Sequence, residues 1–510
     1  MREDLLPCTR QEKASRNKVK VESENETDNL IPVFHSTFNT RHLTFGRPGR
    51  YVILMQNFRG VFMQDRGQWS SKLGFILAAS GSAIGLGNIW RFPYITGANG
   101  GGAFVFLYIL SVLIVAFPIM ITELVIGRTS GKDPVGAFLK LSAPRSPWML
   151  VGALGVLTGF AILSYYAVVA GWTVAYLFKA TTGALAHTTH PEVIFKTFAA
   201  NGKAQVFYLF VFMALTVFVV AGGVKNGIEK AAKILLPVLF VLMLCLIIYV
   251  MTLPQAMKGL HFYLYPDFSK VTPHTFLMAM GQAFFSLSLG MGAMITYGSY
   301  IGKNDNLFTS ALSVTFFDTL IAVMAGLIIF PALGGAPAKS GPSLIFIVLV
   351  QVFQKIPFGQ LIAILFFILM IIAALTSTVS LLEVVSAYFI DEKGMDRKKA
   401  AVILGIFTAI LGIPSALSMG ANAWFTKLDF LGRMDFLFGN ISLTLGGFLM
   451  CLFVAYRWGL RDFMEGLSHG GSVHERRSFR WWFAITIHLI CPISIGGMLL
   501  YILITGNTLG

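Results

Sequence analysis

The sequence predicts an all-α polytopic membrane protein with about eleven transmembrane helices, of which the first and the sixth are broken. Of its 510 residues, 55% are hydrophobic and only 12% are charged, and the mean hydropathy is +0.72. This composition lies far outside that of an ordinary soluble domain. Apolar stretches long enough to cross a bilayer core of roughly 30 Å recur along most of the chain.

The expected spans share this length and contain few charges. They lie near residues 72–97, 103–127, 148–178, 205–221, 230–252, 275–301, 308–335, 358–389, 399–415, 435–457 and 480–504. Lys and Arg, which give a formal net charge of +15, gather in alternate loops. This pattern argues against a nucleic-acid partner, and the positive-inside rule predicts a multi-pass protein with a cytoplasmic N-terminus.

Residues 1–62 differ in kind from the rest, because they are polar and lack a helical period. They form either a disordered cytoplasmic tail or an over-extended start, with Met63 or Met55 as the alternative first residue. Residues 63–510 form the membrane domain. The four cysteines, Cys8, Cys245, Cys451 and Cys491, lack metal-binding spacing and are interpreted as buried thiols.

Two expected spans are interrupted by glycines, at "GSAIGLGNIWRFP" (81–93) and at "FFSLSLGMGAM" (284–294). Interrupted segments in corresponding positions indicate an inverted-repeat transporter whose unwound backbone forms the binding sites. We therefore expect a first repeat of about 70–252, a second of about 274–458 and an extra helix at about 480–504. Close helix packing is the competing interpretation of the glycines, but packing does not explain Asn88 or Arg91.

Other function classes fit the sequence less well. No strand precedes the first glycine run and no P-loop lysine follows it, which argues against a nucleotide site. An ion channel would need a repeated pore ring or filter. An enzyme would need a cluster of catalytic side chains, and the histidines are scattered, so we expect no catalytic residues.

The stretch "WSSKLGFILAASGSAIGLGNIWRFPYITGANGGGAF" resembles the first two helices of the neurotransmitter:sodium symporter family, in its bacterial amino-acid branch. The resemblance extends through "GGVKNGIEKAAKILLP", "GQAFFSLSLGMGAMITYGSY" and "ALTSTVSLLE", and covers the chain from about Trp69 to its end. It implies two inverted five-helix repeats in the bacterial inner membrane.

The resemblance implies two sodium sites built from oxygen donors on the broken helices and the eighth helix. The first would use Ala83, Asn88, Ser286, Asp318 and the substrate carboxylate; the second would use Gly81, Ile84, Ala373, Thr376 and Ser377. Without the resemblance, the hydroxyls of Thr376 and Ser377 would be interpreted as bonded to their own helix.

The resemblance also implies a substrate site. Its expected residues are Ala83, Gly85, Leu86, Gly87, Ile162, Tyr166, Phe285, Ser286, Ser288, Met291 and Leu381. Monoamine carriers of the family have Asp where this chain has Gly85, so a free α-carboxylate is favoured here. The side-chain pocket contains no charge, which favours a neutral, hydrophobic or aromatic amino acid.

Gates and charge compensation follow from the same resemblance. Arg91 and Asp435 would close the outer side, and Arg66 with Asp391, near Trp69 and Tyr300, the inner side. Asp318 stands where many members have Asn, so its carboxylate would replace chloride. Glu123 is a further buried acid expected to face the first helix.

The expected function is therefore sodium-driven symport of an L-amino acid, without a requirement for chloride. An amino-acid sensor on the same scaffold and a carrier of another small carboxylate are the alternatives. Gly227 and Pro237 mark a weak point at the start of the fifth helix, with a simple kink as the alternative. The oligomeric state and the particular substrate are left open.

Overall fold

The computed structural model describes residues 67–143, 146–186, 190–302, 305–335, 341–468 and 477–508. Within these ranges the regular structure is helical, apart from one isolated β-bridge between Gly101 and Pro266. The tail at residues 1–62 and the predicted gate residue Arg66 lie outside the described residues.

The helices up to the middle of the chain include most of the first expected repeat. They are α2 (Lys72–Ala83), α3 (Phe92–Ala98), α4 (Gly102–Ser111), α5 (Phe117–Ser130), α6 (Pro134–Leu141), α7 (Met149–Thr181), α8 (Pro191–Ala200), α9 (Gly202–Ala221), α10 (Lys230–Met251) and α11 (Ala256–Leu264). The later helices are α12 (Pro273–Ser286), α13 (Ala293–Gly298), α14 (Leu307–Leu333), α15 (Leu349–Lys355), α16 (Gly359–Lys393), α17 (Arg397–Leu417), α18 (Ala423–Lys427), α19 (Phe430–Met434), α20 (Leu443–Leu452), α21 (Leu460–Ser468), α22 (Arg477–Ile485) and α23 (Cys491–Thr505).

Short π-helical segments join or extend several of these helices. They are Gly87–Arg91, Val112–Ala116, Val224–Glu229, Leu344–Val348, Asp435–Ser442, Phe453–Trp458 and Thr486–Ile490, and Phe268–Lys270 is a 3₁₀ turn. A π-helical turn shifts the hydrogen-bond register within a continuous helix and occurs frequently at functional sites.

The transmembrane prediction agrees with the described structure. In the described part of the chain, nine helical stretches are long and apolar enough to cross a bilayer. The pair Lys72–Ala83 and Gly87–Ala98, bent by 52°, brings the number to ten if it is one broken span. The sixth expected span comprises α12 and α13, which are separated by the non-helical residues 287–292. The count of about eleven spans is therefore consistent with the helices found.

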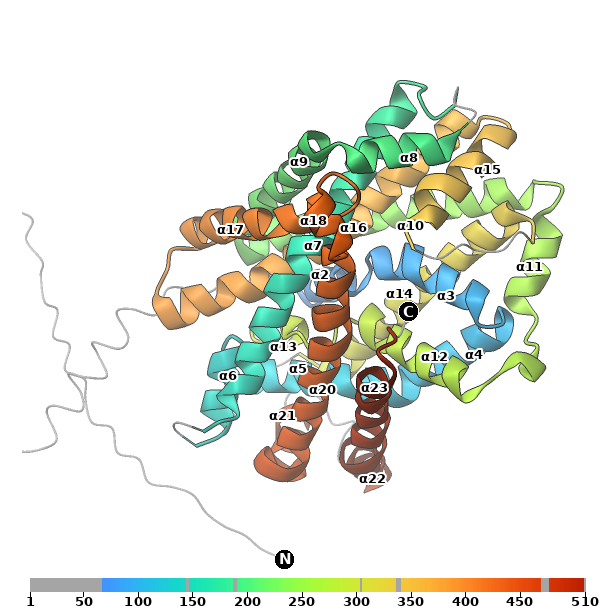
Figure 1. The fold of residues 1–510 in the computed structure, drawn as a ribbon. Coiled ribbons are helices and arrows are strands. Elements are labelled where there is room, and N and C mark those ends of the chain that lie inside the picture. The colour runs from blue at the N-terminus through green and yellow to red at the C-terminus, as the bar shows by residue number, and fades with distance from the viewer. Residues whose placement is uncertain are drawn as a thin grey trace, which may run out of the picture. The chain divides into compact units, whose positions relative to one another are not determined.

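The first helix lies inside the bundle, where α2 contacts α10, α14 and α16 (Figure 1). The outward surface of the bundle is apolar: Phe218 on α9 is 80% exposed and Ile248 on α10 is 69% exposed. Exposed apolar side chains on helices of this length face the acyl chains of a bilayer. The breaks themselves, residues 84–86 and 287–292, are buried within the bundle and do not reach this surface.

The fifth span is helical at the position where the sequence predicts a weak point. It begins with the π-helical turn Val224–Glu229, and Pro237 lies inside the α10 helix that follows. The turn packs tightly, since a Cβ atom on Gly227 would lie 2.0 Å from the carbonyl oxygen of Val219. Unwinding of this turn stays a prediction.

The connection between α5 and α6 buries an aspartate. Asp133 caps α6, where its Oδ1 accepts hydrogen bonds from the N–H groups of Val135 (2.9 Å) and Gly136 (3.3 Å). Its other oxygen, Oδ2, is buried with no hydrogen-bond partner among the described residues. Burial, together with the nearby charges of Asp391 and Glu392, raises the pKa of Asp133 to about 8.

This buried acid predicts a pH dependence of stability. Because the folded state keeps a proton that the unfolded state has released, Asp133 lowers the stability of the fold as pH rises between 3.8 and about 8. In Asp133→Asn, which keeps the capping oxygen, we expect a flatter decline of Tm across this range, measured by thermal unfolding in detergent. Asp396→Asn is the matched control, because Asp396 caps α17 in the same way but is exposed. Parallel pH curves for Asp133→Asn and the wild-type protein would contradict the prediction.

Candidate functional site

The two broken helices meet at their breaks. The α2 helix ends at Ala83, Ile84 is extended, and the helix resumes at Gly87. In the sixth span the backbone turns at Ser288, whose φ is +54°, and at Gly290 and Gly292. The Ser288 hydroxyl donates a 3.0 Å hydrogen bond to the Ser82 carbonyl, which joins the two breaks.

The side chains predicted for the first sodium site converge between the broken helices and α14. The Asn88 amide nitrogen lies 2.7 Å from Asp318 Oδ1 and 2.9 Å from Ser286 Oγ. The Ser286 hydroxyl in turn lies 2.8 Å from Asp318 Oδ2. All three residues are at most 1% exposed. The cluster contains a carboxylate, an amide and a hydroxyl, groups whose oxygens suit a hard cation. Here the Asn88 amide turns its nitrogen toward the carboxylate, and its Oδ1 accepts the Gly85 N–H at 3.0 Å.

Two further residues belong to this cluster and were missed by the sequence analysis. The Tyr108 hydroxyl lies 3.3 Å from Ser286 Oγ, and the Gln282 amide donates to the Gly87 carbonyl at 3.1 Å. Gln282 Oε1 is buried with no hydrogen-bond partner among the described residues. A signal was available, because both are polar side chains within apolar spans and Gln282 precedes Ser286 by one helical turn.

The residues predicted for the second sodium site also lie together. The Thr376 hydroxyl is 3.3 Å from the Ile84 carbonyl oxygen and 3.0 Å from that of Ala373. The Ser377 hydroxyl is 3.3 Å from the Ile84 carbonyl oxygen. Gly81 permits the approach, since a Cβ atom there would lie 3.2 Å from Thr376 Cβ. The Ser377 hydroxyl therefore faces the first helix, whereas the Thr376 hydroxyl lies between the Ile84 carbonyl and the Ile372 and Ala373 carbonyls of its own helix.

A cavity of about 30 Å³ lies beside the first cluster. It is lined by Ala83, Gly85, Gly87, Ile162, Tyr166, Phe285, Ser286, Ser288, Met291, Ser377, Ser380 and Leu381. This set contains every predicted substrate-binding residue except Leu86, whose backbone N–H donates to the Tyr166 hydroxyl at 2.9 Å. The lining carries no charged side chain, and Ser377 and Ser380 were not predicted for it.

Gly85 is required by the close approach of two hydroxyl groups. A Cβ atom at this position would lie 2.3 Å from Ser377 Oγ and 2.8 Å from Tyr166 Oη. Any larger residue would displace these side chains from the break of the first helix.

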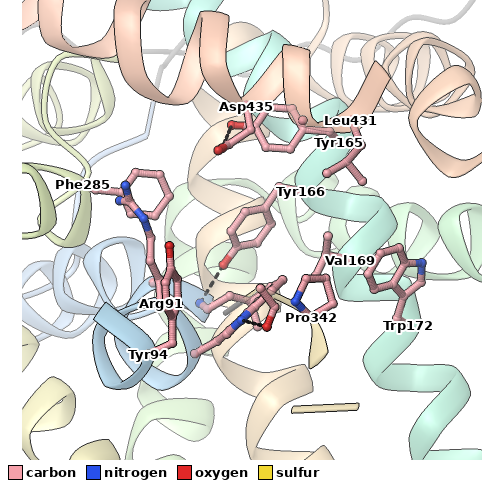
Figure 2. A pocket seen from close by; sticks show the side chains of 15 residues that line it. Arg91, Tyr94, Tyr165, Tyr166, Val169, Trp172, Phe285, Pro342, Leu431 and Asp435 are labelled. Carbon is pink, nitrogen blue, oxygen red and sulfur yellow. Dashed lines mark hydrogen bonds between the residues drawn. The ribbon is translucent and has the colours of Figure 1, made fainter. Parts of the chain in front are cut away.

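A larger cavity of about 230 Å³ adjoins the small one on its outer side, and Tyr166 and Phe285 line both. The predicted outer gate residues Arg91 and Asp435 line the larger cavity. Figure 2 shows the Arg91 guanidinium over the Phe285 ring, at 4.2 Å from its centroid, and Asp435 accepting a 3.0 Å hydrogen bond from Tyr165. Two aromatic rings thus separate the small cavity from the outer one.

Residues expected at the inner gate pack against one another. The Trp69 indole donates a 3.1 Å hydrogen bond to the Tyr297 carbonyl, and its ring packs edge-on against Tyr300. The Tyr300 hydroxyl donates to Glu383 at 2.7 Å, and Arg397 binds the same carboxylate at 2.8 and 2.9 Å.

The sequence analysis expected Trp69 and Tyr300 on the inner side but missed the ion pair of Glu383 and Arg397. The predicted gate residue Asp391 accepts the Asp133 backbone N–H at 2.9 Å, and its expected partner Arg66 is outside the described residues. The ion pair was missed because Glu383 and Arg397 lie 14 residues apart, on two different helices.

Glu123 does not lie where the sequence analysis expected it. Its Oε1 accepts the Gly290 backbone N–H at 2.7 Å, so it contacts the break of the sixth helix rather than the first. The physical reason is that the break frees a backbone donor in an apolar interior, and this donor needs an acceptor. Glu123 Oε2 has no hydrogen-bond partner in the described part of the chain.

The chain is similar in sequence to known sodium-dependent transporters. A model of the sodium:neurotransmitter symporter family matches residues 66–205 and 193–509. The chain is 37% identical over 434 residues to the uncharacterized sodium-dependent transporter YhdH of Bacillus subtilis, covering 84% of this chain and 96% of the relative. It is also 37% identical to an uncharacterized sodium-dependent transporter of Haemophilus influenzae, over 77% of this chain and 90% of the relative.

A solved structure is similar over nearly its full length. The crystal structure of MhsT in complex with L-phenylalanine superposes with a TM-score of 0.78 and 44% sequence identity, over 85% of this chain and 99% of that chain. At this identity the two share a fold, in which two inverted five-helix repeats each begin with a broken helix.

The inner ion pair predicts a loss of stability when one partner is removed. In Arg397→Ala the Glu383 carboxylate would stay buried without its charge partner, and we expect a loss of about 3 kcal/mol. The measurement is thermal unfolding in detergent. The control is the double variant Glu383→Gln with Arg397→Met, which removes both charges and should recover most of the lost stability. A double variant as unstable as Arg397→Ala would contradict this explanation.

Proposed function

The chain belongs to the sodium:neurotransmitter symporter family of sodium-dependent transporters, and we propose that it imports a neutral, hydrophobic or aromatic L-amino acid. We further propose that two sodium ions drive the import, that chloride is not required, and that the protein lies in the cytoplasmic membrane with its N-terminus inside.

The contact of Asn88, Ser286 and Asp318 carries this proposal. These residues put one carboxylate among neutral hydrogen-bonding side chains in a fully buried cluster. A buried carboxylate without a paired side-chain cation is costly in a low-dielectric interior, and a bound cation would remove that cost. A sodium ion there would supply positive charge beside the cavity, where a substrate carboxylate could contact it.

The ends of the small cavity support an amino acid as the substrate. One end has the Tyr166 hydroxyl and the backbone of the first helix break. N–H groups at the start of a half-helix attract a carboxylate, because the helix dipole is positive there. The other end has Ile162, Met291 and Leu381, which favour an apolar side chain. MhsT, 44% identical, was crystallised with L-phenylalanine.

Asp318 supports independence from chloride. Its carboxylate lies within hydrogen-bond distance of both Asn88 and Ser286, so a negative charge beside the first ion is already built into the chain. A mobile anion would add like charge to this low-dielectric site, which is unfavourable.

The two sides of the cavity support alternating access. The outer cavity reaches the Tyr166 and Phe285 rings, while the inner side is closed by Trp69 and by the pair of Glu383 and Arg397. Closing the rings over a bound substrate and then separating the inner contacts would move the substrate across. A sensor would share the binding residues but would not need both sets of contacts to open.

Transport itself is tested with purified protein in proteoliposomes. We expect an inward sodium gradient to accumulate labelled phenylalanine, with unlabelled leucine and tryptophan competing and lysine and glutamate failing to compete. Equal sodium on both sides is the control. Sodium-dependent binding without accumulation would favour the sensor, and competition only by carboxylates lacking an amino group would favour the alternative carrier.

The role of Asp318 gives a second prediction. Replacing chloride by gluconate should leave wild-type uptake unchanged, because the fixed carboxylate supplies the compensating charge. In Asp318→Asn we expect the affinity for sodium to fall on the order of a hundredfold, equivalent to about 2.7 kcal/mol. Sodium titration of uptake measures both effects. A large loss of wild-type uptake in gluconate would disprove chloride independence.

The close packing at Gly85 gives a third prediction. Gly85→Ala places a methyl group 2.3 Å from Ser377 Oγ, so we expect substrate affinity to fall at least about tenfold, equivalent to about 1.4 kcal/mol. Gly497→Ala on α23 is the matched control, since a Cβ atom there meets nothing within 4 Å. Equal substrate affinities for the two variants in a binding assay would contradict the steric argument.

A further inference from the structure

A buried carboxylate outside the sites described above holds the start of the first helix. Glu229, the last residue of the π-helical turn that opens the fifth span, is 1% exposed. Its Oε2 accepts the Ser70 backbone N–H at 2.8 Å, and its Oε1 accepts a hydrogen bond from the Ser70 hydroxyl. Lys233 Nζ lies 2.6 Å from the same Oε1 and donates to the Ser70 hydroxyl at 3.4 Å. Both carboxylate oxygens therefore bind at one point, just before the first helix begins.

Gly74 gives the carboxylate room to reach this point. A Cβ atom on Gly74 would lie 2.8 Å from Glu229 Cγ and would overlap Cδ and Oε1 of the same side chain. The carboxylate thus packs against bare backbone in the first turn of α2, which begins at Lys72. A helix start has N–H groups without partners and the positive end of the helix dipole, so a negative charge is favourable there.

We propose that Glu229 is a positioning residue for the second sodium site, because it fixes the start of the helix whose other end presents a carbonyl oxygen to the ion. The helix α2 is continuous over 12 residues, from Lys72 to Ala83, and is about 18 Å long. Ile84 follows it, and the Ile84 carbonyl oxygen lies 3.3 Å from the hydroxyls of both Thr376 and Ser377. This inference rests on the proposed function, which supplies the sodium site.

The packing around α2 explains how one end affects the other. Near the end of the helix, a Cβ atom on Gly81 would lie 3.2 Å from Thr376 Cβ and 3.8 Å from Leu236 on α10. A helix that fits this closely cannot shift at its start without moving its end relative to α16. Losing the Glu229 contact would therefore reduce the fraction of molecules in which the ion-binding oxygens are in place. The apparent affinity for sodium falls in proportion to that fraction.

Three single variants of the full-length protein test this role. Glu229→Gln keeps the size of the side chain and removes its charge. Gly74→Ala keeps both charges of the ion pair but puts a methyl group where the carboxylate lies, so it still tests the contact if Glu229→Gln does not fold. Lys72→Ala is the matched control, because it removes a 2.8 Å hydrogen bond to Thr309 from the same end of α2, at an exposed position.

The first measurement is hydrogen exchange of the purified proteins in sodium buffer, followed by mass spectrometry. We expect the backbone amides of α2 to exchange at least about tenfold faster in Glu229→Gln and Gly74→Ala, because the helix is released at its start. Lys72→Ala should exchange like the wild-type protein, and the amides of α7 should be unchanged throughout. Unchanged exchange of α2 in both variants would overturn the proposal, as would equal acceleration in Lys72→Ala.

The second measurement separates positioning from a general loss of stability. In proteoliposomes, the sodium concentration for half-maximal uptake of labelled phenylalanine should rise about tenfold in Glu229→Gln and Gly74→Ala. At saturating sodium, the KM for phenylalanine should stay within about twofold of the wild-type value. A protein that is merely less stable would lose maximal rate without a change in its sodium requirement.

The two measurements fail in different ways. Faster exchange of α2 together with an unchanged sodium requirement would overturn the link between Glu229 and the ion site. If the wild-type protein shows no sodium-driven uptake, the proposed function fails. Hydrogen exchange needs no transport activity, so it still decides whether Glu229 holds α2.

Discussion

The structure depends on one constraint, which is that every backbone polar group inside an apolar bundle needs a partner. Breaking the first and sixth helices frees carbonyl and N–H groups far from water. The chain satisfies them with side chains: Glu123 accepts the Gly290 N–H, Gln282 donates to the Gly87 carbonyl, and Ser288 donates to the Ser82 carbonyl. These contacts hold the two breaks against each other, and the candidate ion and substrate sites occupy the space between them.

Two buried carboxylates, Asp318 and Glu383, also depend on the side chains that surround them. Asp318 is held among the neutral donors Asn88 and Ser286 rather than beside a basic side chain. Its buried charge therefore favours a cation from solution, which is the physical basis of the proposed sodium site. Glu383, by contrast, is neutralised within the chain by Arg397 on the inner side. The two carboxylates differ in function because their partners differ.

Much of this arrangement could be predicted from the sequence. Glycine runs and isolated polar residues in apolar spans are local signals, and they identified both breaks and Asn88, whereas Asp318 came from the family resemblance. Partners that lie far apart in the sequence were harder to predict, because nothing near Glu383 in the sequence indicates that it contacts Arg397 or Tyr300. The orientation of Glu123 was wrong for a related reason: its partner is a backbone N–H of another helix, which has no sequence signature. Tyr108 and Gln282 carried a local signal that the motif comparison did not include.

The inner ion pair has a consequence for how the protein can open. A buried ion pair is close to neutral in its net contribution, because the attraction between its charges roughly offsets the hydration that each has lost. If Arg397 and Glu383 separate in the proposed opening, water restores that hydration. A plug of large apolar side chains would have to be exposed to water instead, at a cost proportional to its area. An ion pair can therefore block the passage of solutes in the closed form. The open form, in which both charges are hydrated, still lies close to the closed form in free energy.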